Sequence, residues 1–175
     1  MLGGAIMILD RSGRYRIEYE DALRAIGHYL DVNLYRNVSI IELTEGLLAK
    51  GTAMRSAHRA VRLYSRTYLF KNDEIERILE DAYSRRGRGL ATLPDAARVT
   101  LSNQDMLRVV GRVVDEEKWH DIVATQVPDG VRIKALVRPQ TTAPEDDQVI
   151  DVFLSEVEIR RWVDELRTGR RPIRD

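Results

Sequence analysis

Arginine and histidine gather in one stretch of the chain, which we call the basic segment. Its members are Arg55, His58, Arg59, Arg62 and Arg66, and no acidic residue interrupts it. Arginine binds phosphates and carboxylates through planar, bidentate contacts, and Tyr64 and Tyr68 are available to stack on nucleic-acid bases. The basic segment is therefore the predicted binding site, and nucleic acid is one ligand that it fits.

An acidic segment occupies the corresponding place later in the chain. Positions 139–150 contain Glu145, Asp146 and Asp147 and no basic residue. A contact between the two segments, within one chain or between two chains, is a second interpretation of the basic segment. A third is an ordinary solvated loop, because runs of charge are common on protein surfaces.

The residue pattern does not favour catalysis. The histidines are His28, His58 and His120, and their spacing is not that of metal ligands on one helix. His120 and Asp121 are a base beside a carboxylate, but neighbouring residues on a strand point to opposite faces, so we expect both to be solvated. Phosphate-loop, dinucleotide-loop and hydrolase-elbow motifs are missing. We therefore predict a protein that is not an enzyme, with no catalytic residue, no metal and no cofactor.

The chain contains an internal repeat. Asp21-Ala22-Leu23-Arg24 recurs as Asp105-Met106-Leu107-Arg108, an offset of 84 positions. The same offset relates Gly27 to Gly111, Lys50 to Lys134 and Arg77 to Arg161, without a gap. Self-similarity at a fixed period is the signature of repeated structural units.

Each copy is predicted to form an α-β-β-β-α unit. Leu23, Ile26 and Leu30 in one copy and Leu107, Val110 and Val114 in the other have the spacing of a helix with one apolar face. Alternating apolar residues then predict strands near 38–43, 47–53 and 63–70, with a polar loop over 54–62, and near 122–127, 131–137 and 148–154. A second helix closes each unit, with a buried stripe of Ile75, Ile78, Leu79 and Ala82 or of Ile159, Trp162, Val163 and Leu166.

The expected fold class is α+β, a tandem duplication of this unit. Each unit would be an antiparallel three-stranded meander with its helices on one face, and the two units would be related by a pseudo-twofold axis. The expected division is an N-terminal segment at 1–20, repeats at 21–86 and 101–175, and a linker at 87–100. A short strand is expected before each first helix, at 14–19 and 98–103.

Gly27 and Gly111 occupy matching positions inside helices, where glycine costs about 1 kcal/mol relative to alanine. The expected compensation is close packing of each helix on its own sheet, with contact between the two first helices as the alternative. Trp119 and Trp162 are expected in the core. The carboxylates of Asp115, Glu116 and Glu117 are expected to face water.

The composition of the chain further limits the functions that we expect. The chain has 175 residues, 43% of them hydrophobic, with 28 basic and 28 acidic side chains and no cysteine. A net charge of zero does not require an anionic partner, and the absence of cysteine fits a reducing cytoplasm. We expect a cytoplasmic binding or regulatory protein that acts through protein–protein contacts, without membrane contact. Self-association and nucleic-acid binding by an arginine-rich surface remain the alternatives.

Overall fold

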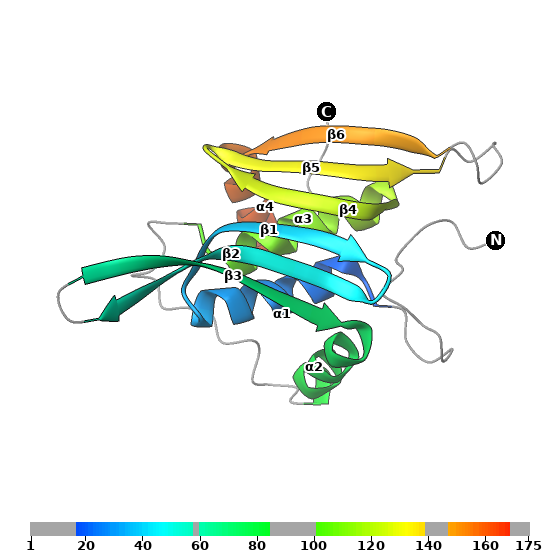
Figure 1. The fold of residues 1–175 in the computed structure, drawn as a ribbon. Coiled ribbons are helices and arrows are strands. Elements are labelled where there is room, and N and C mark those ends of the chain that lie inside the picture. The colour runs from blue at the N-terminus through cyan, green and yellow to red at the C-terminus, as the bar shows by residue number, and fades with distance from the viewer. Residues whose placement is uncertain (1–16, 58–59, 85–100, 139–146, 169–175) are drawn as a thin grey trace.

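The computed structural model describes residues 17–57, 60–84, 101–138 and 147–168, which form an α+β fold (Figure 1). The elements in chain order are α1 (Tyr19–Val32), β1 (Tyr35–Leu43), β2 (Gly46–Ala57), β3 (Ala60–Lys71), α2 (Asn72–Ser84), α3 (Asn103–Glu117), β4 (Trp119–Val127), β5 (Gly130–Val137), β6 (Gln148–Ser155) and α4 (Glu156–Thr168). All six strands join one antiparallel sheet in the order β3-β2-β1-β4-β5-β6. The predicted α+β class and the strand meanders are confirmed.

A short ladder between β1 and β4 unites the two meanders. Three residue pairs form it: Ser39 with Thr125, Ile40 with Ala124, and Ile41 with Val123. Side chains continue the pairing on either side, since Gln126 Oε1 accepts from Val38 N at 3.2 Å and Glu42 Oε2 accepts from Ile122 N at 3.1 Å. Ile40 and Ala124, at the middle of the ladder, are 84 positions apart, as are Val38 and Ile122.

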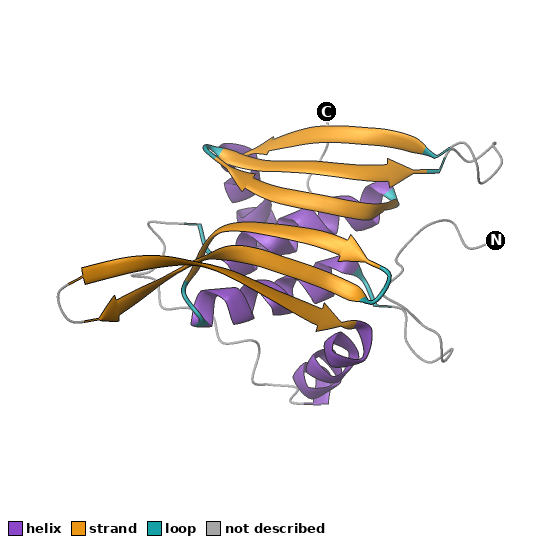
Figure 2. Cartoon of the chain, viewed as in Figure 1, coloured by secondary structure: helices purple, strands orange, loops and turns teal. Residues whose placement is uncertain are grey.

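A single hydrophobic core lies between one face of the sheet and the helices (Figure 2). The inward positions of the strands alternate with outward ones, as the sequence predicted, and all four helices contribute buried residues to the same core. Trp119 and Trp162 are buried in it as predicted, whereas Ile78 is only half-buried. No described element covers the other face of the sheet.

Helices α1 and α3 pack directly on each other behind the sheet. A β-carbon on Gly27 would lie 2.6 Å from Asn103 O, and one on Gly111 would lie 2.5 Å from Tyr19 O. Since ordinary contacts of this kind are 3.4–4 Å long, the glycines allow the backbones to approach closely. The prediction that these glycines serve helix-to-sheet packing was wrong, and the alternative of contact between the two first helices is what the structure shows.

Each of these two helices also caps the other. Asp31, near the end of α1, accepts hydrogen bonds from the backbone N–H groups of Asn103 and Gln104, both at 2.9 Å. Asp115, near the end of α3, accepts from the N–H groups of Tyr19 and Glu20, at 2.9 and 2.8 Å. Asp115 was expected to face water, but the antiparallel packing buries much of it.

Burial sets the charge state of these two capping carboxylates. It raises the pKa of Asp115 to about 7 and raises that of Asp31 as well, although the hydrogen bonds from the backbone act in the opposite direction. Glu18 and Glu20 add to the shift of the Asp115 pKa through like-charge repulsion. The contact between α1 and α3 is therefore expected to depend on pH.

Several sequence predictions require correction. The loop expected at 54–62 is mostly strand, because β2 continues to Ala57 and β3 begins at Ala60. The short strands expected at 14–19 and 98–103 do not form in their described parts, where Tyr19 and Asn103 already begin helices. The linker at 87–100 lies outside the described residues. None of the described helices combines the length and the apolar character needed to cross a bilayer.

Candidate functional site

The basic segment lies on a two-stranded arm formed by the ends of β2 and β3. This arm extends beyond the rest of the sheet (Figure 1). Arg55 and Arg62 are direct cross-strand partners, while His58 and Arg59 lie outside the described residues. Arg66 is exposed, and its guanidinium carbon stands 5.9 Å from the centre of the Tyr35 ring. The structure thus gathers the described members of the segment on one hairpin.

The described members of the basic and acidic segments do not meet within the chain. β3 and β6 are opposite edges of the sheet, about 24 Å apart at the usual spacing between strands. Asp147, the described member of the acidic segment, instead pairs with Arg138 at 3.1 Å. Glu145 and Asp146 lie outside the described residues. A contact between Asp147 and the described arginines of the basic segment therefore requires a second chain.

The uncovered sheet face offers a larger surface, which we call the open face. It consists of two rows of outward residues that run across the six strands. One row is Thr67, Lys50, Ser39, Thr125, Arg132 and Phe153, and the other is Leu69, Leu48, Ile41, Val123, Lys134 and Asp151. Half-buried apolar residues occupy the centre, and Phe153 at the β6 edge is 51% exposed.

The charge of the open face is positive. Lys50, Lys134 and Arg132 are its cations, and Asp151 is its anion. Arg132 holds Asp151 in a bidentate pair with both contacts at 2.7 Å, which lowers the pKa of Asp151. Lys50 and Lys134 form no ion pair with the described residues. The open face therefore presents two unneutralised lysines beside an apolar centre, on a chain whose net charge is zero.

His120 differs from its prediction because the strand is irregular at this point. Asp121 has a left-handed φ of 50°, and the register of β4 with β5 shifts between His120 and Val123. The bulge removes the strand alternation, so His120 Nδ1 lies 2.7 Å from Asp121 Oδ2 while His120 itself is buried. Its Nε2 atom is also buried, 3.5 Å from Asp147 Oδ2. Nε2, the ring nitrogen that would accept a proton from a ligand, is therefore not exposed among the described residues.

Tyr19, which is buried, and Glu42, which is half-buried, lie between α1 and the sheet near this histidine. The Tyr19 hydroxyl lies 2.8 Å from both carboxylate oxygens of Glu42. Burial raises the pKa of both groups, and the negative charge of Glu42 raises that of Tyr19 further. The positions that correspond at the offset of 84 are Asn103 and Gln126, which carry no charge.

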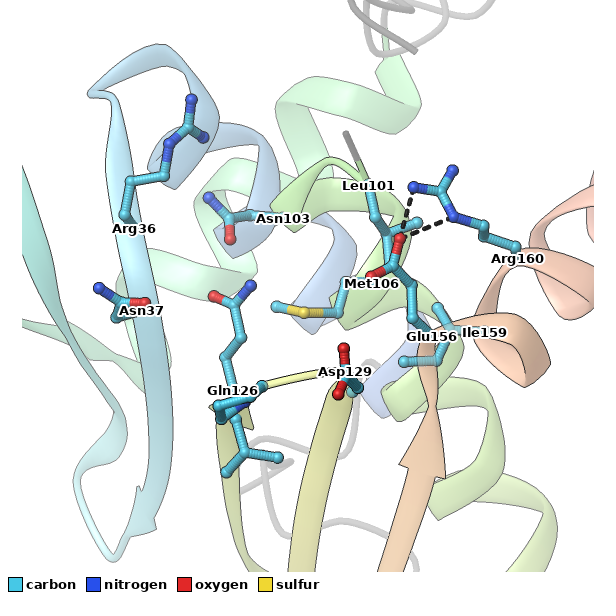
Figure 3. A pocket seen from close by; sticks show the side chains of 13 residues that line it. Arg36, Asn37, Leu101, Asn103, Met106, Gln126, Asp129, Glu156, Ile159 and Arg160 are labelled. Carbon is cyan, nitrogen blue, oxygen red and sulfur yellow. Dashed lines mark hydrogen bonds and ion pairs between the residues drawn. The ribbon is translucent and has the colours of Figure 1, made fainter. Parts of the chain in front are cut away.

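A pocket of about 450 Å³ opens beside Asn103 and Gln126 (Figure 3). Its walls come from the start of β1, the N-terminal end of α3, the turn between β4 and β5, and α4. The residues that line it include Arg36, Met106, Asp129, Ile159 and the hydrogen-bonded pair of Glu156 and Arg160. Among the described residues, no group of His, Asp and Glu is arranged to hold a metal ion.

Sequence reasoning missed both the open face and the pocket. Lys50 and Lys134 are 84 positions apart, and strand alternation places both on the same side of their strands, which was a usable signal. The polarity of Asn103 and Gln126 at otherwise apolar elements was a weaker one. Comparisons of the chain with protein-family models, curated proteins and solved structures gave no match. The class that the fold defines is an α+β protein with one six-stranded antiparallel sheet, helices on one face and an open face on the other.

Proposed function

We propose that the chain is a tandem duplication of one α-β-β-β-α unit, with its two copies arranged about a pseudo-twofold axis. The support is a set of contacts that recur at the 84-residue offset. Asp31 and Asp115, Gly27 and Gly111, and Glu42 and Gln126 each make the same contact with the opposite copy. The division into repeats at 21–86 and 101–175 belongs to this proposal.

The function that this arrangement supports best is that of a non-catalytic binding protein, whose partner is another protein with an acidic, partly apolar surface. The observation that carries the proposal is the open face, where Lys50 and Lys134 flank an apolar centre. Apolar area supplies affinity when it is buried on binding, and unpaired lysines select partners with carboxylates. A second copy of the chain is a poorer match, because two such faces would bring lysines together.

A titration with a designed peptide tests this role. The probe is a synthetic amphipathic helix with leucines on one face and glutamates beside them, followed by nuclear magnetic resonance of the labelled protein. The expected result is saturable shifts on Ile41, Leu48 and Val123. The double variant Lys50→Glu with Lys134→Glu should lose this binding because its face repels the probe.

The control uses another basic pair related by the same offset. Arg77 on α2 and Arg161 on α4 are exposed on the helical side, so Arg77→Glu with Arg161→Glu changes the net charge equally but leaves the open face intact. This control should bind the probe as the wild type does. If the shifts are confined to other surfaces, or if both double variants lose binding of the probe equally, the open face is not the binding surface.

The nucleic-acid alternative rests on the arm. Like charges directly opposite each other destabilise a strand pair, and the register places Arg55 opposite Arg62. Two arginines at paired positions of one hairpin offer cations to a polyanion. The arm also presents Arg66 to solvent, and the combination is the specific observation in favour of this second role.

Replacing Arg55, Arg59, Arg62 and Arg66 by glutamate separates the alternatives. If the arm serves nucleic acid, the variant should lose retention on a polyanion column, and binding to a duplex should fall steeply with salt in the wild type. If the arm joins two chains, light scattering should show a lower mass for the variant. No change in either measurement would identify the arm as ordinary solvated surface.

A further inference from the structure

The pocket lies beside Asn103 and Gln126, the positions that correspond to Tyr19 and Glu42 at the offset of 84. Tyr19 spans the gap between its helix and Glu42, and its hydroxyl bonds to that carboxylate. Asn103 is much shorter, and its Nδ2 donates to Tyr35 O at 3.0 Å. The space that a tyrosine ring would fill between positions 103 and 126 is left open. Pockets of 300–1,000 Å³ are typical of small-ligand sites.

The polar groups of the pocket favour an acceptor or an anion at one end. Gln126 Oε1 already accepts from Val38 N, so its Nε2 donor is the group left for a ligand. Arg36 is exposed and forms no ion pair with the described residues. Figure 3 shows Arg36 and Gln126 on the same side of the pocket, across from Arg160. A carboxylate there would gain a charge-assisted contact with the guanidinium.

The remainder of the pocket favours an uncharged, apolar group. Leu101 and Val127, both half-buried, supply apolar surface, while Met106, which is only 3% exposed, lies between the two polar sides (Figure 3). Glu156 neutralises Arg160 through contacts of 2.8 and 2.5 Å. The exposed carboxylate of Asp129 would repel a second negative charge. A ligand with one carboxylate and an apolar body would contact both the polar end and the apolar part of the pocket without bringing a second negative charge near Asp129.

We propose that this pocket binds a small monocarboxylate with an apolar body, with Arg36 and Gln126 holding the carboxylate and Leu101 and Val127 contacting the body. This is a ligand site beyond the protein contacts proposed for the open face. The two surfaces share no residue, so either proposal can fail while the other stands.

A pair of matched probes tests the site. 4-Phenylbutanoate carries a carboxylate on an apolar body, and 4-phenylbutanamide has the same body without the charge. The acid should give saturable shifts of the Gln126 side-chain amide and the Met106 methyl group. The amide should bind at least about tenfold more weakly, since a hydrogen bond to a charged group is the stronger one.

Three variants assign the contacts. Arg36→Gln should remove the preference for the acid, because the guanidinium is gone. Asn103→Tyr with Gln126→Glu recreates the pair found at Tyr19 and Glu42, and should abolish binding of both probes by filling the pocket. Gln126→Glu alone, which keeps Asn103 in place, should weaken the acid by repulsion and spare the amide. Arg77→Gln, at an exposed position of α2, is the control and should bind both probes as the wild type does.

Circular dichroism melts check that each variant is folded. Should Asn103→Tyr with Gln126→Glu fail to fold, Arg36→Gln and Gln126→Glu still decide the proposal. It is overturned if the acid causes no saturable shift at Gln126 and Met106, or if acid and amide bind equally. An unchanged preference for the acid in Arg36→Gln would also overturn it.

Discussion

Alanine in place of Gly111 tests the close approach of α1 and α3. The new β-carbon would lie 2.5 Å from Tyr19 O and 2.6 Å from Glu20 Cα, so the helices must separate by about 1 Å to restore ordinary contact. That movement stretches the bonds from Asp115 to the same two residues, now 2.9 and 2.8 Å, beyond good hydrogen-bond length.

The expected magnitude follows from three opposing effects. Overpacking costs about 1–3 kcal/mol, and loss of a helix cap costs about 1 kcal/mol more. Alanine stabilises a helix by about 1 kcal/mol relative to glycine through its higher helix propensity. We therefore expect Gly111→Ala to lower the free energy of unfolding by about 1–3 kcal/mol in urea titrations. Gly27→Ala should act similarly, because its β-carbon meets Asn103 and Gln104 in the same way.

The double variant and a surface control complete this test. Gly27→Ala with Gly111→Ala should cost less than the sum of the single changes, because helices already pushed apart accommodate the second β-carbon. Glu80→Ala, at an exposed position of α2, should stay within about 0.5 kcal/mol of the wild type. A gain in stability for Gly111→Ala, as in an isolated helix, would refute the close approach.

Three further outcomes are expected. Because burial raises the pKa of Asp115 to about 7, the folded protein binds this proton more tightly than the unfolded chain. The contribution of Asp115 to stability should then fall as pH rises from about 4 to about 7. The measurement is the difference in melting temperature between the wild type and Asp115→Asn, which cannot titrate, across this pH range. A difference that does not change with pH would contradict the expectation. Trp162→Ala should lower the free energy of unfolding by about 3–5 kcal/mol as a large-to-small core change. In a Trp119→Phe protein, the remaining Trp162 should show the blue-shifted fluorescence of a buried indole, and emission typical of solvated tryptophan would count against its burial. Tyr19→Phe should cost about 1–3 kcal/mol because the buried Glu42 loses a donor, and an unchanged urea midpoint would show that water replaces the hydroxyl.

Much of the local structure followed from the sequence. The periodic apolar residues around Leu23 and Leu107 were enough to predict helices α1 and α3, and alternation was enough for the strands, because both patterns depend on neighbours within one element. The offset that relates Lys50 to Lys134 was also visible. The prediction from local sequence failed at the polar stretch 54–62, which was expected to be a loop, because β2 continues through this stretch to Ala57.

The tertiary structure decided how the elements meet. Gly111 has the same local sequence signal whether it faces a sheet or another helix, and only the packing of α1 on α3 selects between them. Asp115 gains its raised pKa from residues far away in the chain, so its sequence neighbours could not indicate it. The pocket likewise is lined by residues of β1, α3, β4 and α4, which come together only in the folded chain. The sequence by itself determined the elements and their apolar faces through short-range periodicity, whereas contacts between distant segments determined the shared core, the open face and the pocket.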